Sequence, residues 1–211
     1  MGKLVSKIQK TLPSTIIIPE EILIFFDWIE KNGELIELED GLLIGSPPGD
    51  YDECTLIEIS PEEDSSEWWC FDSELAKSSN LSERIYIFAR TGADGSCAAF
   101  WLDDDGKQKI VHIGSGSGSA MMCVLADEPI DFLRLLAIGY EEICWNDEYT
   151  NPPDNANEMN QDFKEWVISQ FGVSIPLKAS DIVPNPTEMW DLESTDPFCK
   201  WISKLNKDEC E

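Results

Sequence analysis

The stretch IYIFARTGADGSCAAFWLDDDGKQKIVHI, residues 85–113, contains three apolar runs separated by polar turns. The runs at 85–89, 97–102 and 109–113 are rich in the aromatic and β-branched residues that favour strands. Asp105 and Gly106 lie between the second and third runs, and an Asp-Gly pair in such a place is a strong signal for a tight hairpin. The stretch therefore predicts neighbouring strands of an antiparallel sheet.

One helix and several short strands are predicted around this stretch. Residues 19–33 predict the helix, because Pro19 suits a first helical turn, apolar residues recur at helical spacing, and Gly33 follows the last of them. Four other short apolar runs predict strands, at 34–38, 41–45, 54–59 and 120–126.

Three more helices are predicted towards the C-terminus. One begins at Pro129 and ends near Gly139, one follows Asn160 and ends at Gly172, and one begins at Pro197. The last two carry too many aromatic side chains to stand free in water, so we expect them to fold back on the main body. The expected fold class is α+β: a twisted, mainly antiparallel sheet with helices packed on it, plus a C-terminal helical extension. We expect a core at residues 1–145 and the extension at residues 146–211.

The chain is strongly acidic, with 42 Asp and Glu residues against 15 Lys and Arg residues and a formal net charge of -27. Two blocks hold the excess: residues 20–83 contain nineteen acids and two lysines, and residues 127–163 contain ten acids and one arginine. A field of this sign speeds encounter with basic partners and repels nucleic acid and anionic lipid. We therefore expect a basic protein partner, with no nucleic-acid or membrane partner; the oligomeric state stays open.

The N-terminal residues and the cysteines favour a cytoplasmic protein without cofactors. The apolar run from Ile16 to Ile18 is too short for a signal peptide or a membrane span. The opening MGKLVS fits a loose N-myristoylation pattern, but we expect a frayed basic tail there. Seven cysteines without a CxxC pair predict free thiols and no zinc site.

Three features resemble catalytic or ligand-binding motifs, but each lacks a required residue. The run GSGSGS, residues 114–119, has neither the lysine of a phosphate-binding loop nor the spacing of a dinucleotide fingerprint, so we expect a flexible strand connection. A calcium loop starting at Asp103 would need glycine where Gln108 stands, which leaves an exposed hairpin tip. His112 is the single histidine, and we expect it to be structural or solvent-facing. No catalytic residue is predicted, and we expect no enzyme activity.

Aromatic side chains beside carboxylates are the predicted contacts for a basic partner. Trp68 and Trp69 follow the acidic run 62–67, and an exposed tryptophan ringed by carboxylates can hold an arginine or a lysine. Either one of the two tryptophans is exposed or both are partly buried. The predicted partner-binding residues are Glu62, Glu63, Asp64, Glu67, Trp68, Trp69, Asp94, Asp103, Asp104 and Asp105.

Three stretches together resemble one known family. They are IPEEILIFFDWIEKNGE (18–34), IYIFARTGADGSCAAFWLD (85–103) and EPIDFLRLLAIGY (128–140). Their order is similar to the opening helix, central strands and closing helix of the SUKH superfamily, which is related to the fungal Smi and Knr cell-wall regulators. DFKEWVISQFG (162–172) and DPFCKWI (196–202) resemble the tail of some members.

The resemblance implies a protein-binding scaffold, because bacterial members of this family are immunity proteins that cover the active site of a toxin. A toxin that acts on nucleic acid needs a basic surface, which an acidic inhibitor would fit. We therefore expect an immunity protein that neutralises a cognate toxin domain. Two alternatives remain: a regulatory or scaffolding module of the same fold, and a carboxylate-dependent hydrolase. The hydrolase requires a concave pocket with two close carboxylates, one of which has a raised pKa.

Overall fold

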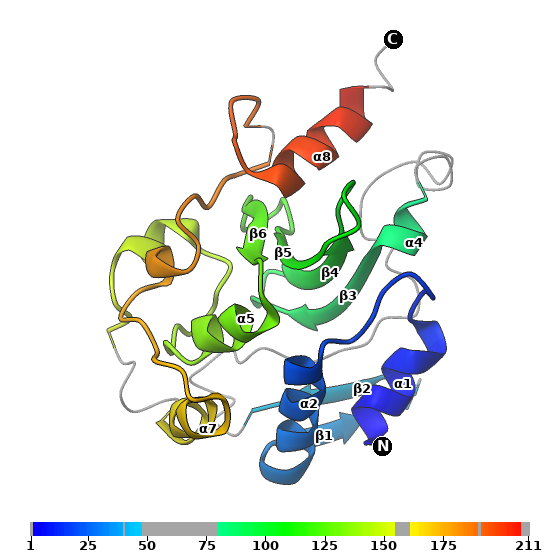
Figure 1. The fold of residues 1–211 in the computed structure, drawn as a ribbon, viewed down its shortest axis with the longest axis vertical. Helices are drawn as coiled ribbons and strands as arrows, with labels where there is room; N and C mark the ends of the chain where they lie inside the picture. Colours follow the sequence, from blue (N-terminus) through cyan, green and yellow to red (C-terminus); the bar gives the residue numbers. More distant parts are fainter. Residues whose placement is uncertain (1, 40, 48–79, 155–160, 190, 208–211) are drawn as a thin grey trace.

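The computed structural model describes residues 2–39, 41–47, 80–154, 161–189 and 191–207 and has a mixed α+β architecture (Figure 1). At its centre is a four-stranded antiparallel sheet in the order β3-β4-β5-β6. The strands are Ile85–Arg90, Cys97–Leu102, Gln108–Ile113 and Met122–Ala126. A separate antiparallel pair joins β1 (Glu34–Glu37) to β2 (Leu43–Ser46). The predicted antiparallel sheet with helices packed on it is confirmed.

The central strands are apolar on both sides because both faces of the sheet are covered. On β4, Ala98 and Phe100 belong to the larger apolar core, whereas Cys97, Ala99 and Trp101 belong to a second core on the opposite face. An antiparallel sheet with one face in water would instead alternate apolar and polar residues. The unbroken apolar runs of the sequence therefore reflect a sheet packed between two layers.

The larger core lies between the sheet and the helices α2 (Glu20–Asn32) and α5 (Pro129–Leu136). Phe88 of β3 contacts Phe26 of α2 and Phe132 of α5, with ring centroids 6.5 and 5.5 Å apart. Helix α7 (Gln161–Phe171) packs outside this layer, where Trp166 stacks on Trp28 at 4.9 Å (Figure 1). The helix predicted after Asn160 thus folds back on the main body.

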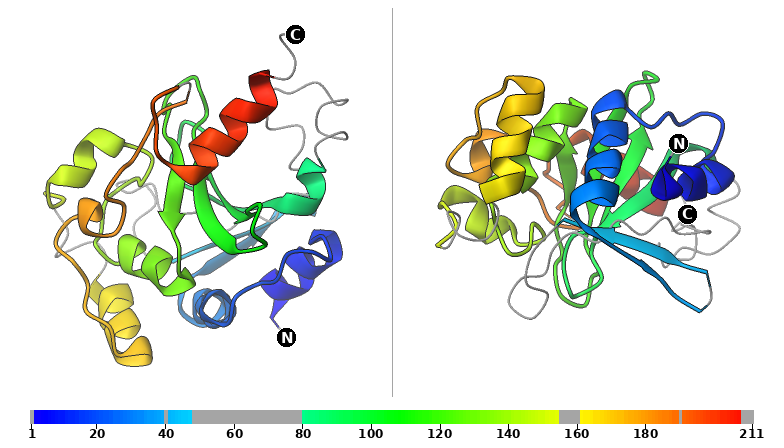
Figure 2. Two further views of the ribbon diagram at one scale, coloured as in Figure 1. Left: turned by 45° about the horizontal axis from the view of Figure 1, so that its top comes forward. Right: turned by 90° about the horizontal axis from the view of Figure 1, so that it is seen from below.

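The second core lies on the other face of the sheet, beneath α8 (Pro197–Lys207) and the short helix α4 (Leu81–Arg84). Two views show α8 and α2 on opposite sides of the sheet (Figure 2). Phe198 and Trp201 of α8 contact Trp101 at ring-centroid distances of 5.1 and 5.6 Å. Asp196 caps α8, since its Oδ1 accepts the Cys199 N–H at 2.8 Å, and this confirms the predicted helix start.

The C-terminal segment also covers the free edge of strand β6. Met122 N–H donates to Thr187 O at 2.7 Å, and Val124 N–H donates to Asp196 Oδ2 at 3.0 Å. An uncovered edge strand would present such donors to other chains. Thr187 and Asp196 therefore protect this edge from unwanted strand pairing.

The N-terminal residues form a packed helix, so the expectation of a frayed tail is wrong. Helix α1 (Lys3–Thr11) buries Leu4, Val5 and Ile8, which share one helical face. Its first turn is held by α2, because Leu4 N–H donates to Glu30 Oε1 at 2.7 Å. Burial of the three apolar side chains and this carboxylate cap fix the segment against the body.

Candidate protein-binding surface

The structure does not bring the described partner-binding candidates together. Glu62, Glu63, Asp64, Glu67, Trp68 and Trp69 lie outside the described residues. Asp94 precedes β4 and the run Asp103 to Asp105 follows it. Six strand residues at ~3.3 Å each separate the two places by about 20 Å. They occupy opposite ends of the sheet.

Asp94 ties together the two loops at its end of the sheet. Its Oδ1 accepts the Ser96 N–H at 2.9 Å. Its Oδ2 accepts the Ser115 hydroxyl and the Ser119 N–H, both at 2.7 Å, and the Ser96 hydroxyl at 2.8 Å. We call Asp94, Ser96, Ser115 and Ser119 the Asp94 cluster. Burial alone would raise the pKa of Asp94, but these hydrogen bonds together outweigh it and lower that pKa.

The Asp94 cluster orders the Gly-Ser run that we expected to be flexible. Gly116 has φ of +73° and donates its N–H to Ser119 O at 3.0 Å, which makes a tight turn. A Cβ at Gly118 would lie 2.6 Å from Asp94, so only glycine lets the backbone approach that carboxylate. The run is the predicted strand connection, but the Asp94 cluster holds it in place.

The turn after β4 uses its first two aspartates internally. Asp103 Oδ1 accepts the N–H groups of Asp105 and Lys107 at 3.0 and 2.8 Å. Asp104 forms an ion pair with Arg84 at 2.9 Å. Among the described residues, the Asp105 carboxylate has no partner. The tip thus offers one unengaged carboxylate and one that a partner would share with Arg84.

His112 is structural, one of the two alternatives that the sequence left open. It is fully buried on β5, and its Nδ1 and Nε2 lie 2.8 Å from Met121 O and 2.9 Å from Thr91 Oγ1. Because a carbonyl only accepts, Nδ1 carries the proton and Nε2 accepts from the Thr91 hydroxyl. Burial lowers the pKa of His112 to about 4, so the ring is neutral at pH 7.

A second acidic region, residues 141–154, is attached firmly beside the Asp94 cluster. We call it the acidic segment. Glu142 Oε1 accepts the Ala93 N–H and Oε2 accepts the Trp145 indole N–H, both at 2.6 Å. Ser119 Oγ donates to Cys144 O at 2.6 Å, and the buried Tyr149 hydroxyl donates to Ile143 O at 2.6 Å. These bonds fix the segment to the end of the sheet.

Carboxylates crowd around Glu148 in the acidic segment, which also carries a half-buried tryptophan. Partial burial raises the pKa of Glu148, and repulsion from four neighbouring carboxylates raises it further; these belong to Asp147, Glu141, Glu142 and Asp154. Trp145 is half-buried and its indole N–H is held by Glu142. The sequence reasoning noted this acidic block but did not select Trp145. The signal was present as a tryptophan three residues after Glu142 within an acidic run.

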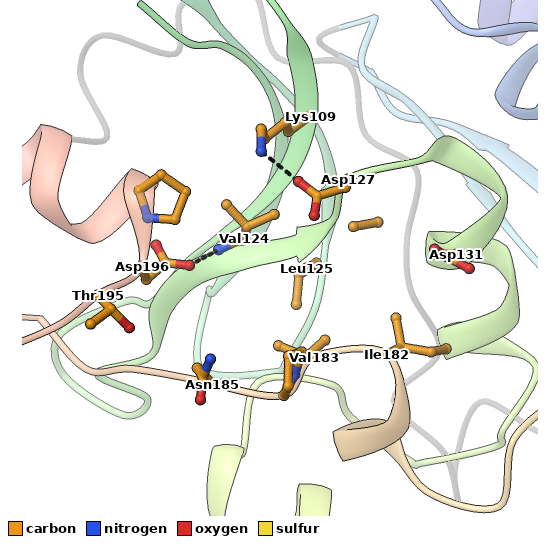
Figure 3. A pocket seen from close by; sticks show the side chains of 13 residues that line it. Lys109, Val124, Leu125, Asp127, Asp131, Ile182, Val183, Asn185, Thr195 and Asp196 are labelled. Carbon is orange, nitrogen blue, oxygen red and sulfur yellow. Dashed lines mark hydrogen bonds and ion pairs between the residues drawn. The ribbon is translucent and has the colours of Figure 1, made fainter.

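A pocket with a volume of about 230 Å³ lies between the edge of β6, residues 182–185 and the start of α8 (Figure 3). It has two of the features that the hydrolase alternative requires: carboxylates line it, those of Asp127, Asp131 and Asp196, and burial raises the pKa of Asp196. Asp196, however, already accepts the N–H groups of Val124 and Cys199, one with each carboxylate oxygen. Its role is to cap α8 and the strand edge, which does not favour proton transfer.

The described residues contain no group of three His, Cys, Asp or Glu side chains that could hold a metal ion. None of their helices is long and apolar enough to cross a membrane. The four cysteines that the structure describes are buried and form no disulfide with one another: Cys97, Cys123, Cys144 and Cys199. Comparisons with family models, curated proteins and solved structures found no match.

Proposed function

We propose that the protein is an immunity protein that binds and neutralises a basic toxin domain through the acidic segment. The resemblance of its sequence to the SUKH superfamily and the net charge of -27 support this function. The observation that carries it is the crowding of four carboxylates around Glu148 on a segment that is fixed to the sheet and also carries the half-buried Trp145.

The acidic segment suits the arginines and lysines with which a nucleic-acid-directed toxin holds phosphate. Carboxylates supply the negative charge that phosphate would provide, and the face of the Trp145 ring can stack on a guanidinium group. Partial burial and, after it, repulsion from neighbouring carboxylates raise the pKa of Glu148 in the free protein, and a basic partner would relieve the repulsion. Relief of that repulsion should lower the pKa of Glu148 and release protons on binding.

The test first identifies a basic toxin domain, for example from neighbouring genes, and then measures its binding to this protein. We expect the double variant Asp147→Lys/Glu148→Lys to slow association at least about tenfold at low salt, because steering depends on the local field. Trp145→Ala should act mainly on dissociation and weaken binding by about 2 kcal/mol, as a central aromatic anchor does. The control Glu34→Lys/Glu37→Lys makes the same charge change on the exposed strand β1.

The comparison of variants separates the acidic segment from the alternatives. Equal loss in the β1 control would mean that only total charge matters, and the acidic segment would not be the site. A loss confined to Asp105→Lys would place the contact at the tip after β4 instead. Modest affinity without protection of cells from the toxin would favour the regulatory or scaffolding module.

A further inference from the structure

Strand β1 is an edge strand whose backbone hydrogen-bonding groups are only half used. It pairs with β2, and Leu38 N–H continues this pairing by donating to Leu42 O at 2.8 Å. In an antiparallel pair every second residue exchanges hydrogen bonds with the neighbouring strand, so the even-numbered residues of β1 bond to β2. The N–H and C=O groups of Leu35 and Glu37 therefore point to the opposite edge, where no described residue bonds to them.

The same edge is open to solvent. Figure 1 shows β1 at the margin of the ribbon, beyond β2. Side chains alternate along a strand, so Ile36 and Leu38 share one face, and they are 41% and 42% exposed. Leu35 points to the other face and packs against the larger core. The core thus holds the strand by one face and leaves its edge and two apolar side chains uncovered.

The hairpin of β1 and β2 is uniformly acidic. Residues 34–47 contain four acids and no lysine or arginine. Glu34, Glu37 and Glu39 are exposed, and none of them forms an ion pair with another described residue. Lys7 reaches the turn of the hairpin, where its Nζ donates to Gly41 O at 3.0 Å. The carboxylates beside the open edge are therefore available to a partner.

These carboxylates decide which strand can pair with the edge. Charged side chains on an edge strand normally prevent pairing between copies of a protein, because like charges opposite each other destabilise a sheet. A second copy of this chain would add the same three carboxylates and a further net charge of -27. A strand that carries Lys or Arg beside Glu37 gains the attraction that a second copy lacks. Charge complementarity thus selects a basic strand and excludes self-pairing.

We propose that the open edge of β1 binds an extended basic segment of another protein, which adds a strand to the hairpin. The backbone groups of Leu35 and Glu37 bond to the segment, as in other cases of strand addition to a sheet edge. Its alternate residues lie on opposite faces, with Lys or Arg beside Glu37 and apolar side chains on Ile36 and Leu38. The edge does not include the acidic segment, and its test needs no toxin.

The experiment titrates a capped peptide of alternating lysine and valine, six residues long, into the isotopically labelled protein at about 0.15 M salt, which screens unspecific attraction. We expect saturable backbone amide NMR shifts centred on β1, with a Kd on the order of 1 mM. At saturation, hydrogen exchange should slow at least about fivefold at Leu35 and Glu37. It should change less at Leu38, whose N–H is already bonded to Leu42.

Matched peptides and variants separate strand pairing from charge attraction. The same peptide with N-methyl groups on alternate amides cannot pair with an edge and should not bind, and a peptide of alternating glutamate and valine should not bind either. Glu37→Gln should weaken binding about two- to threefold, because it removes one exposed charge pair. Glu193→Gln removes the same charge from an exposed site on the C-terminal segment and should leave the Kd unchanged.

Three results would overturn the proposal. Equal binding of the N-methylated peptide would exclude backbone pairing, and an equal loss in Glu193→Gln would show that only total charge matters. Saturable shifts confined to the acidic segment, or no saturable shifts at all, would show that the edge of β1 does not take up a basic strand.

Discussion

Replacing Asp94 with Asn tests whether the Asp94 cluster holds the loops at that end of the sheet. The carboxylate accepts four hydrogen bonds, two of them from the backbone N–H groups of Ser96 and Ser119. An amide can rotate either way, but its NH₂ group then faces one of those backbone donors, which loses its acceptor. The serine hydroxyls can turn and adapt, so the loss is concentrated in one charged hydrogen bond.

The expected cost is about 2 kcal/mol of unfolding free energy at pH 7. Hydrogen bonds to a charged group contribute roughly 1.5–3 kcal/mol, and partial exposure of Asp94 favours the lower half of that range. Urea unfolding, followed by tryptophan fluorescence, measures the difference between wild type and Asp94→Asn. Asp105→Asn is the matched control, because the same change there removes no described side-chain contact, and it should cost less than about 0.5 kcal/mol.

The pH dependence of this difference has a definite sign. The folded-state pKa of Asp94 is lowered from the ordinary 3.8 of an aspartate side chain, so the carboxylate stabilises the fold above that value. This stabilisation is lost as the pH falls through the folded-state pKa. The gap between wild type and Asp94→Asn should therefore be constant from pH 7 to about pH 5 and narrow below pH 4. A gap of similar size for Asp105→Asn, or one that widens in acid, would refute the assigned role.

Substitutions at three further positions test the packing around the sheet by unfolding free energy. Arg84→Ala should cost about 2 kcal/mol, because the Arg84 guanidinium donates twice to Leu102 O and lies 4.7 Å from the Trp201 ring. Arg84→Lys should recover less than half of this lost stability, since lysine lacks the planar guanidinium. Asp196→Ala should cost about 3 kcal/mol by removing the cap of α8 and leaving the Val124 N–H unpaired, and a loss below 1 kcal/mol would contradict that role. Gly118→Ala should cost about 1–3 kcal/mol because its Cβ has no room, and an unchanged midpoint would contradict the close approach.

The strands and helices could be predicted wherever local patterning and tertiary packing agree. The three runs of residues 85–113 became β3, β4 and β5 because burial on both faces demands continuous apolar residues. Helix α1 was not predicted, because its three lysines suggest a solvated tail. The helical spacing of Leu4, Val5 and Ile8 was the signal for a packed helix. The order of the Gly-Ser run could not be predicted, because the bonds that hold it come from Asp94, some twenty residues earlier.

The acidic partner-binding surface stays a prediction, and the acidic segment now proposed for it is not the region that was selected from the sequence. The acidic block at residues 127–163 is evident in the sequence. The predicted aromatic contacts were instead Trp68 and Trp69, which lie outside the described residues. The contacts that fix Trp145 depend on Glu142 reaching Ala93, a separation of 49 residues along the chain. The acidic run around Trp145 can be found in the sequence, but a contact of that range follows from the tertiary fold and could not be predicted from local pattern.

Helix α8 covers the sheet face that carries the second core, and during synthesis this face stays uncovered until α8 has been made. The ribosome adds the first residue of α8 about 70 residues after the last residue of β6, a delay of roughly 4–14 seconds at ~5–20 residues per second. Until then Trp101 and its apolar neighbours are not covered by α8, and one face of the nascent sheet exposes apolar side chains. Chaperone capture during this interval should be strongest at the strands facing α8 and should cease once that helix has left the exit tunnel.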